Sequence, residues 1–342
     1  MKKILAILLV CCLGLCACKA DLPAETTAEE TTGPTAEDTT ESASETEAAT
    51  ETETETETET ETETETETET ETEKVTEAET PPPPKPKPEM YAYVGDYTVY
   101  DPHNTRGLSE THHGYSFGVA KDGKAHSVSQ NNQKYFDSLS DVDALALDTR
   151  SKEKVIYLTF DCGYEYNNNT AKILDILKEK QIPAAFFCTL SFIKTCPDTT
   201  GRIINEGHVL GNHSNTHPVF PYISRTEMAR ELWDVDKYVS DKYGYEMEYF
   251  RFPTGGYSHS SLELCTGVGY KSVFWSLAYT DWDTSNQLGY DNAFSTVTSR
   301  LHPGAVILLH AVSDDNVAIL SDFIDYAISN GYTFACLDDY DW

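Results

Sequence analysis

The sequence predicts an α/β fold in which parallel strands form a closed or nearly closed barrel, preceded by a long acidic segment. Two observations predict the barrel. From Lys154 onward, short apolar runs typical of buried strands alternate with amphipathic helical segments in seven β-α units. Repeated β-α alternation produces a parallel sheet, and this number of units is enough to curl it. Polar motifs follow the strands, at the sheet edge where such folds place their chemistry.

The first expected strand runs from Val155 to Phe160 and is almost entirely apolar. Further strands share its short length and its bounding turn residues. They are expected at residues 184–189, 207–211, 249–251, 271–276, 305–309 and 332–336. Helices are expected at residues 170–180, 224–244, 291–301 and 316–330, with a shorter one ending at Ile203-Ile204. The longest opens with Ser224-Arg225-Thr226-Glu227, which is a capping-box sequence.

Residues 89–150 are rich in Tyr, Asp, Gly and Asn and contain few apolar runs. We expect an irregular leader here that packs on the barrel, with a short helix at 142–147. The remaining residues, 151–342, form the principal domain, and together with the leader they are enough for one well-packed core. Five cysteines fall in this part without a Cys-x-x-Cys zinc pattern, and a domain of this size does not need disulfides.

The N-terminus has the features of an export signal. Lys2 and Lys3 precede an apolar stretch, residues 4–15, which is too short to span a bilayer. It leads into Leu15-Cys16-Ala17-Cys18, which resembles the bacterial lipobox. We therefore expect residues 1–17 to be removed and Cys18 to be lipidated, which would hold the protein at the outer face of the cytoplasmic membrane. A plain signal peptide is the alternative.

Residues 19–88 are expected to be a disordered tether. Glu and Thr alternate from Glu45 to Glu73 with one interruption, and aromatic residues are absent. Like charges along one face oppose strand pairing, so we expect a charge-extended coil followed by a stiffer proline-rich spacer at 81–88. Residues 21–80 carry 23 acidic residues and one lysine, which accounts for −22 of the net charge of −32. This balance, with no basic patch, argues against a nucleic-acid partner.

Four polar motifs follow expected strands and supply hydrolytic chemistry. Asp161 follows the first strand and is a candidate general base, although such a residue also commonly caps a turn. His213 and His217 have the i, i+4 spacing of a metal-binding pair, although two solvent-facing histidines would look the same. Arg251 could orient a carboxylate or form a surface salt bridge. His310 ends an apolar strand as a candidate acid or a core residue.

In this order and spacing, the motifs resemble those of the polysaccharide deacetylase family, also called carbohydrate esterase family 4 or the NodB homology domain. The resemblance covers about residues 150–336 and rests on five motifs. They are 159–165, His213-Ser214-Asn215-Thr216-His217, Arg251-Phe252-Pro253, Asp281-Trp282 and Leu308-Leu309-His310. The stretches 115–118, 160–165 and 274–282 are similar to the delta-lactam-biosynthetic de-N-acetylases, which act on muramic acid in peptidoglycan of spore-forming bacteria.

The resemblance implies a distorted (β/α)7 barrel and a role for each motif residue. Asp161 is then the catalytic base, Arg251 its partner, His310 the general acid and Asp281 the carboxylate that tunes it. His213 and His217 are implied to bind a divalent metal, with zinc favoured over cobalt or manganese. The substrate-binding residues expected are Tyr164, through its backbone N–H, together with Pro253, Trp282 and Leu308.

Cys162 departs from the family pattern, which usually has a metal-binding aspartate at this position. A thiolate is a good zinc ligand, so Cys162 is expected to be the third protein ligand, although its side chain is shorter than that of aspartate. The predicted activity is removal of N-acetyl groups from peptidoglycan amino sugars, with N-acetylmuramic acid favoured and a muramic delta-lactam as a further product. The alternatives are deacetylation of N-acetylglucosamine or xylan, or an inactive tethered wall-binding module. Glycan strands and the membrane are the expected partners, and no protein partner is predicted.

Overall fold

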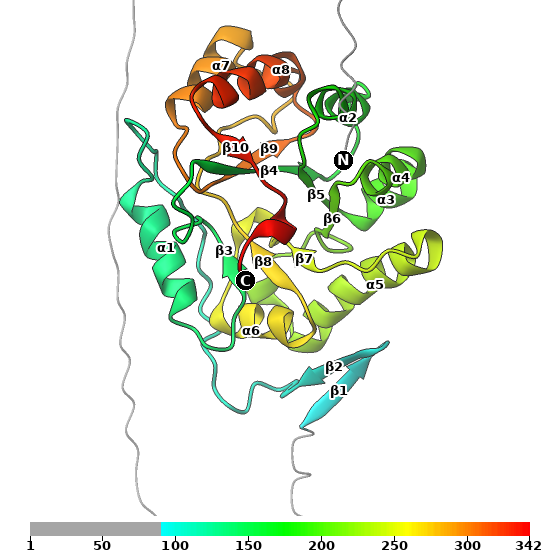
Figure 1. Cartoon of the computed structure of the whole chain (residues 1–342). Helices are drawn as coiled ribbons and strands as arrows, with labels where there is room; N and C mark the ends of the chain where they lie inside the picture. Colours follow the sequence, from blue (N-terminus) through cyan, green and yellow to red (C-terminus); the bar gives the residue numbers. More distant parts are fainter. Residues whose placement is uncertain (1–89) are drawn as a thin grey trace, which may run out of the picture. The chain divides into compact units, whose positions relative to one another are not determined.

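The computed structural model describes residues 90–342, and the expected signal peptide, Cys18 and tether lie outside the described residues. A parallel sheet forms the centre of the described part (Figure 1). Its strands lie in the order β10-β4-β5-β6-β7-β8-β3, and β9 also pairs with β4. The strands are β3 (Ala144–Leu145), β4 (Val155–Cys162), β5 (Ala185–Cys188), β6 (Val209–Asn212), β7 (Tyr249–Phe250), β8 (Lys271–Val273), β9 (Ala305–His310) and β10 (Thr333–Phe334).

The sheet curls towards a barrel. The second half of β4 pairs with β5. β9 pairs with β4 as well, from Ile156 to Asp161. A parallel bridge between Leu277 and Ile307 then joins the segment after β8 to β9, which brings the two ends of the strand series together. The strands predicted from the sequence are present, although β5, β6, β7, β8 and β10 are shorter than expected.

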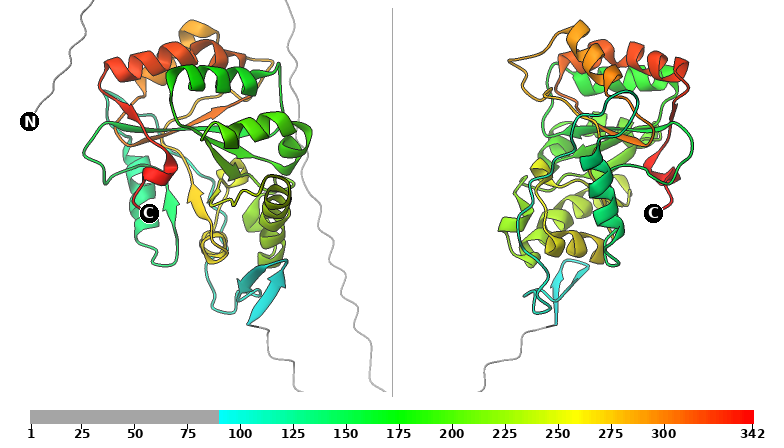
Figure 2. Two further views of the ribbon diagram at one scale, coloured as in Figure 1. Left: turned by 45° about the vertical axis from the view of Figure 1, so that its right-hand side comes forward. Right: turned by 90° about the vertical axis from the view of Figure 1, so that its left-hand side faces the viewer.

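Helices cover the outer face of this sheet (Figures 1 and 2). Successive helices contact one another around it, including α7 with α8, α8 with α2, α2 with α4, and α5 with α6. Their bounds are α2 (Asn169–Lys180), α3 (Leu190–Thr195), α4 (Pro197–Asn205), α5 (Arg225–Tyr243), α6 (His259–Gly267), α7 (Tyr290–Ser299) and α8 (Asp314–Ser329). The predicted capping box of α5 is confirmed, because Ser224 and Glu227 exchange side-chain and backbone hydrogen bonds, and Gly244 ends the helix with φ 62°.

Two hydrophobic clusters lie on the two faces of the sheet. The larger one fills the space between the sheet and the helices. The smaller one lies inside the barrel and includes Tyr157, Phe187, Val209 and Val306, which come from four different strands. Most of its members are at or near the N-terminal ends of their strands, where residues 337–342 pack against them. One end of the barrel is therefore filled with side chains.

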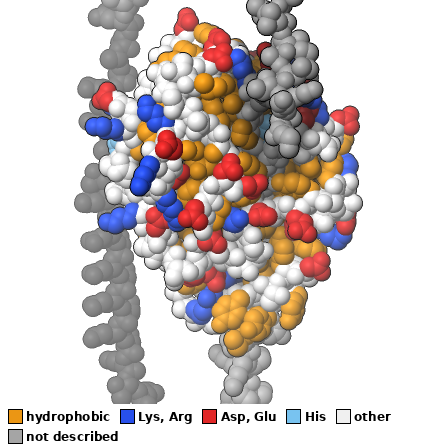
Figure 3. Space-filling view, viewed as in Figure 1, with side chains coloured by type: hydrophobic (Ala, Val, Ile, Leu, Met, Phe, Trp, Pro, Cys, Tyr) orange, Lys and Arg blue, Asp and Glu red, His pale blue; other side chains and the backbone are white. Residues whose placement is uncertain are grey.

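The leader is more regular than expected. It contains an antiparallel hairpin, β1 (Tyr91–Val94) and β2 (Tyr97–Tyr100), followed by α1 (Ser127–Asp137) and β3. The helix predicted at 142–147 is wrong, because Ala144 and Leu145 pair in parallel with β8 as an added strand. Exposed hydrophobic side chains gather on the hairpin (Figure 3), and they include Tyr91, Tyr93 and Tyr100.

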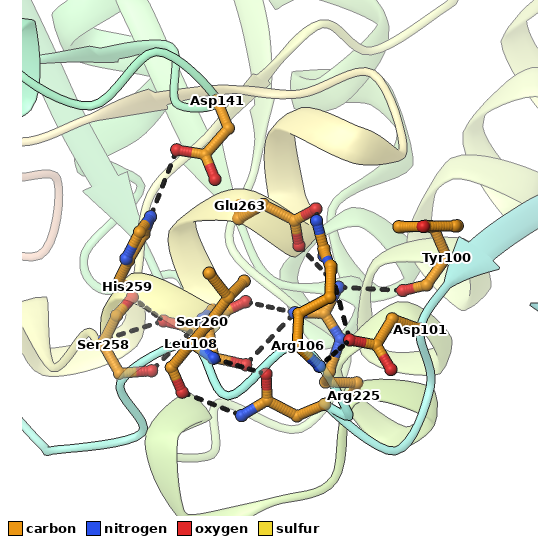
Figure 4. Close-up of polar contacts among 12 residues, drawn as sticks. Tyr100, Asp101, Arg106, Leu108, Asp141, Arg225, Ser258, His259, Ser260 and Glu263 are labelled. Carbon is orange, nitrogen blue, oxygen red and sulfur yellow. Dashed lines mark hydrogen bonds and ion pairs between the residues drawn. The ribbon is translucent and has the colours of Figure 1, made fainter. Parts of the chain in front are cut away.

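Charged side chains connect the leader to α5 and α6 (Figure 4). Glu263 of α6 accepts hydrogen bonds from Arg106 of the leader and Arg225 of α5, each at 2.6 Å. Arg106 also pairs with Asp101 at 3.1 Å. Burial alone would raise the pKa of Asp101, but hydrogen bonds from the Arg106 and Thr105 backbone hold it below its ordinary value. The network thus fixes the leader against two helices.

In the part of the chain from Met90 to Trp342, no helix has the length and hydropathy needed to cross a bilayer. The five cysteines of this part are all free thiols.

Candidate active site

Strand alternation places the predicted catalytic residues inside the barrel. In β4, Tyr157 belongs to the inner cluster, so Asp161, four residues later, points to the same face. The same alternation relates Val306 to His310 in β9, Val209 to His213 after β6, and Tyr249 to Arg251 after β7. Because the strands are parallel, these four side chains meet at the C-terminal end of the barrel, opposite its filled end.

Asp161 and Arg251 form a buried ion pair. The guanidinium Nη1 of Arg251 donates to Oδ1 of Asp161 at 2.8 Å, and Arg251 is fully buried. Arg251 is held by further contacts, since its Nε donates to the Val273 carbonyl at 2.9 Å and its guanidinium lies 4.1 Å from the ring centre of Phe187. Burial alone would raise the pKa of Asp161, but Arg251, His213 and His310 lower it. Asp161 is therefore an ionised carboxylate that can accept a proton.

His213 and His217 point their Nε2 atoms towards each other across 3.2 Å. Nδ1 of His213 donates to the Arg251 carbonyl at 2.8 Å, which leaves Nε2 as the nitrogen with a free lone pair, 3.7 Å from Asp161 Oδ2. Burial lowers the pKa of His213 to about 4 and also lowers that of His217. Both rings are neutral near pH 7. The pair lies in a loop rather than on a helix, and His217 has φ 60°.

The geometry of this histidine pair fits one divalent metal ion. Two neutral imidazoles whose Nε2 atoms point towards one position are common metal ligands, and the Asp161 carboxylate lies beside them. Among residues 90–342, however, no group of three or more His, Cys, Asp or Glu side chains is arranged to hold a metal. The protein ligands that this arrangement offers are His213 and His217.

Cys162 is not brought to these histidines, which corrects the expectation that its thiol completes the metal site. Since Asp161 points into the barrel, Cys162 points outward, and it is fully buried in the cluster beneath the helices. It lies in register with Cys188 of β5. Burial and the neighbouring Cys188 raise the pKa of the Cys162 thiol, so the thiolate that binds metals is disfavoured there.

His310 is paired with Asp281. Nδ1 of His310 donates to Oδ1 of Asp281 at 2.7 Å, which leaves Nε2 available to the cavity. Oδ2 of Asp281 accepts from the side chain of Asn316 at 2.6 Å, and Tyr279 donates to Asn316 at 2.6 Å. Burial alone would lower the pKa of His310, but the Asp281 carboxylate raises it above its ordinary value. His310 can therefore carry a proton near neutral pH, as a general acid must.

These groups share one cavity of about 1190 Å³. Asp161, His213, His217 and His310 lie on its wall, as do the predicted substrate-binding residues Tyr164, Trp282 and Leu308. Tyr164 and Trp282 are about half exposed at 52% and 57%, so their rings are accessible to a sugar. Pro253 is buried and does not line the cavity, and its neighbours Phe252 and Thr254 do.

Sequence reasoning missed several residues of this wall. Phe117 comes from the leader and Trp275 from the segment after β8, and both lie in stretches singled out above. Tyr115 holds this side of the cavity, because its hydroxyl donates to the Trp275 carbonyl at 2.5 Å. Arg300 follows α7 and had no motif to mark it. The leader is thus part of the cavity and not only a support.

Known proteins of one family are similar to this chain. A family model for polysaccharide deacetylases matches residues 148–273. The peptidoglycan-N-acetylmuramic acid deacetylase PdaA of Bacillus subtilis is 42% identical over 190 residues, which are 55% of this chain and 72% of that protein. An uncharacterized 30.6 kDa protein of Geobacillus stearothermophilus is 40% identical over 230 residues, 67% of this chain and 86% of that protein.

Solved structures show the same fold. The structure of Bacillus subtilis PdaA, a family 4 carbohydrate esterase, has a TM-score of 0.62 and 36% identity, covering 68% of this chain and 97% of that chain. A family 4 carbohydrate esterase from Bacillus anthracis has a TM-score of 0.55 and 39% identity, with the same coverage of both chains. The distorted (β/α)7 barrel expected from the sequence is confirmed. This chain belongs to the polysaccharide deacetylase family and is a hydrolase of amide bonds.

Proposed function

We propose that this chain removes the N-acetyl group from N-acetylmuramic acid in peptidoglycan. The observation that carries the proposal is that an ionised carboxylate, Asp161, and a protonatable imidazole, His310, face one cavity that is wide enough for a sugar. The relative from Bacillus subtilis that is 42% identical bears the name of an N-acetylmuramic acid deacetylase, which supports this substrate over N-acetylglucosamine.

Asp161 acts as the general base. Its carboxylate takes a proton from the water that attacks the acetamide carbonyl carbon. Arg251 keeps this carboxylate ionised and fixes its direction through the 2.8 Å hydrogen bond. Because Arg251 is buried and bound to two backbone carbonyls as well, the base does not need to reorganise before it accepts the proton.

His310 acts as the general acid. The bond between the carbonyl carbon and the nitrogen breaks as Nε2 of His310 donates a proton to the departing amine. Asp281 stabilises the imidazolium form before transfer and fixes the ring through Nδ1. One water is consumed, and the products are acetate and a free amino sugar.

His213 and His217 would hold a divalent ion, with zinc favoured and cobalt or manganese as alternatives. Such an ion would supply Lewis-acid stabilisation for the negative charge that develops on the carbonyl oxygen. A backbone N–H near Tyr164, which is a residue of the same cavity wall, would donate a hydrogen bond to that oxygen. Trp282 and Leu308 would pack against the sugar and its acetyl methyl group.

On a muramic acid that lacks its peptide, the freed amine lies close to the lactyl carboxyl group of the same sugar. Condensation of the two groups with loss of water would give the muramic delta-lactam. We propose that the protein reaches this substrate from the outer face of the cytoplasmic membrane, to which lipidated Cys18 would anchor it. The acidic tether of residues 19–88 would then extend the barrel into the wall.

The proposal is tested by measuring acetate release by the purified protein from peptide-stripped peptidoglycan, chitooligosaccharides and acetylated xylan. Each reaction is run with added zinc or cobalt and with a chelator, and His310→Ala is the matched inactive control. Release from peptidoglycan alone, with muramic acid as the deacetylated sugar, is the expected result. Acetate release from chitooligosaccharides or xylan would instead identify N-acetylglucosamine or acetylated xylan as a substrate. Glycan binding without release from any polymer would instead support a wall-binding module.

A further inference from the structure

Arg300 places a positive charge on the wall of the catalytic cavity. It caps the C-terminal end of α7, and its side chain is half-buried beside Thr296, one helical turn earlier. Nη1 of Arg300 donates to the Ala278 carbonyl at 2.7 Å. Among the described residues that line this cavity, Arg300 is the one with a lysine or arginine side chain.

The Arg300 guanidinium has no carboxylate partner within residues 90–342. Other half-buried or buried arginines of this part of the chain are paired, as Arg251 is with Asp161 and Arg225 is with Glu263. Arg300 has no such ion pair, and the hydrogen bond to Ala278 uses one of its five N–H groups. A permanently charged group that is partly removed from water is stabilised by an anion, so this part of the cavity favours an anionic ligand.

Arg300 lines the same cavity as Asp161 and His310, and its anchoring segment pairs with the strand that carries His310. Its hydrogen-bond partner Ala278 follows Leu277, which bridges Ile307 and accepts the backbone N–H of Leu308. His310 is two residues beyond Leu308 in β9, roughly 7 Å along the strand at the usual rise. The guanidinium is therefore anchored beside the segment that pairs with Leu308, on the wall of the cavity that the sugar would enter.

We infer that Arg300 binds the lactyl carboxylate of muramic acid. This inference rests on the proposed function, and it names the residue that selects the substrate. Muramic acid carries its lactyl ether on the ring carbon next to the one that bears the acetamido group. A sugar whose acetamide lies between Asp161 and His310 would therefore present this carboxylate nearby. The planar guanidinium can bind it with two parallel hydrogen bonds, which a neutral group cannot accept equally well.

Recognition by charge separates three sugars of similar shape. N-acetylglucosamine has a neutral hydroxyl at this ring carbon. Muramic acid that carries a peptide has a neutral amide in place of the free carboxylate. Only the peptide-free muramic acid presents an anion to Arg300, so the residue discriminates against both of the other sugars.

The test combines one protein change with one substrate change, using the full-length protein. Wild type and Arg300→Met are assayed on a peptide-free muramic oligosaccharide and on its lactyl methyl ester, which has lost the charge. Arg300→Met should raise KM for the free acid roughly 10- to 100-fold, with kcat little changed. For the ester, wild type and variant should have the same KM. Arg300→Lys should have a KM for the free acid between those of wild type and Arg300→Met, because lysine keeps the charge but not the planar arrangement of N–H groups.

Arg230→Met, an exposed arginine on α5, is the matched control and should leave both KM values unchanged. Equal KM values of wild type and Arg300→Met for the free acid would overturn the inference while leaving the proposed function intact. If wild type releases no acetate, the proposed function fails, and the inference is then decided by binding. The dissociation constant of each oligosaccharide is then measured for Asp161→Asn alone and for Asp161→Asn combined with Arg300→Met. The added Arg300→Met change is expected to weaken binding of the free acid roughly 10- to 100-fold and to leave binding of the ester unchanged.

Discussion

Asp281 accepts two hydrogen bonds from His310, one from the ring Nδ1 at 2.7 Å and one from the backbone N–H at 2.8 Å. The carboxylate therefore fixes both the position of the strand end and the orientation of the ring. Asn316 and, behind it, Tyr279 hold the carboxylate in turn. His310 is oriented by a chain of buried groups and needs little rearrangement during the reaction.

Asp281→Asn should reduce kcat on the order of 10²- to 10⁴-fold, because the acid loses its orientation and its charged partner. Asp281 raises the pKa of His310, so its removal lowers that pKa. His310 must be protonated to act, and the alkaline limb of the pH–rate profile should therefore move to lower pH. Measuring kcat across pH checks this. An alkaline limb that stays in place would mean that another group supplies the proton.

Arg251→Met should shift the acid limb of the same profile in the opposite sense. Arg251 helps to hold the pKa of Asp161 below its ordinary value, so the pKa rises when the guanidinium is removed. The base is then protonated at a higher pH, and activity should begin at a higher pH. An acid limb that does not respond to this change would exclude Asp161 as the titrating base.

The Asp161–Arg251 pair should also make stability depend on pH. Since the folded-state pKa of Asp161 is lowered, the stability it contributes is present above the unfolded pKa and is lost as pH falls through the folded value. Breaking a buried pair costs about 3–5 kcal/mol. Urea unfolding of wild type and Arg251→Met should thus differ most near neutral pH, and the difference should narrow in acid. A constant difference would contradict the linkage.

Metal content should depend on the histidines and not on Cys162. His213→Gln should lower zinc affinity by at least about 10-fold, because half of the ligand pair is lost. Cys162→Ser should retain the wild-type zinc stoichiometry, because its side chain faces the helices. Elemental analysis after dialysis against limiting zinc compares the two variants with wild type, and far-UV circular dichroism checks that each is folded. If Cys162→Ser lost zinc and His213→Gln kept it, the Cys162 thiol would be a metal ligand after all.

Glu263→Gln should destabilise the protein by about 3–5 kcal/mol, because Arg225 would remain buried without its counter-charge. The leader would also lose its contact through Arg106. Asp241→Asn is the matched control, since it breaks the exposed Lys237–Asp241 pair on α5 and should cost less than about 1 kcal/mol. Free energies of unfolding from urea titrations measure both. If the two changes lowered the free energy of unfolding equally, the buried pairs of Glu263 would contribute no more to stability than an exposed pair.

The common location of Asp161, Arg251 and His310 could be predicted because each one ends or follows an apolar strand, and parallel strands bring their C-terminal ends together. Strand alternation also explains the residue that was misplaced. Once Asp161 is assigned to the inner face, Cys162 must point outward, so the period of two residues argues against its role as a ligand. The motif resemblance carried more weight in the prediction than this local geometry.

Other features depend on contacts that no local pattern reveals. The helix α1 has few apolar residues, and its buried Gln133 bonds to backbone groups of residues 144–147. Ala144 and Leu145 of this segment form β3 because β8 offers an edge that is otherwise unpaired, which the sequence does not show. Arg300 is likewise distinctive only because α7 ends beside the cavity, with Ala278 in reach of the guanidinium.

The inner cluster at the N-terminal ends of the strands limits how substrate and product can enter and leave the barrel. Leu337 and Tyr340 pack into this cluster. A barrel that is solid at one end has no through-channel. Under the proposed function, the sugar would therefore enter and acetate would leave through the same open end of the barrel. A bound glycan that covers this opening would then hold acetate in the cavity, so acetate would leave only after the sugar has moved away from the mouth.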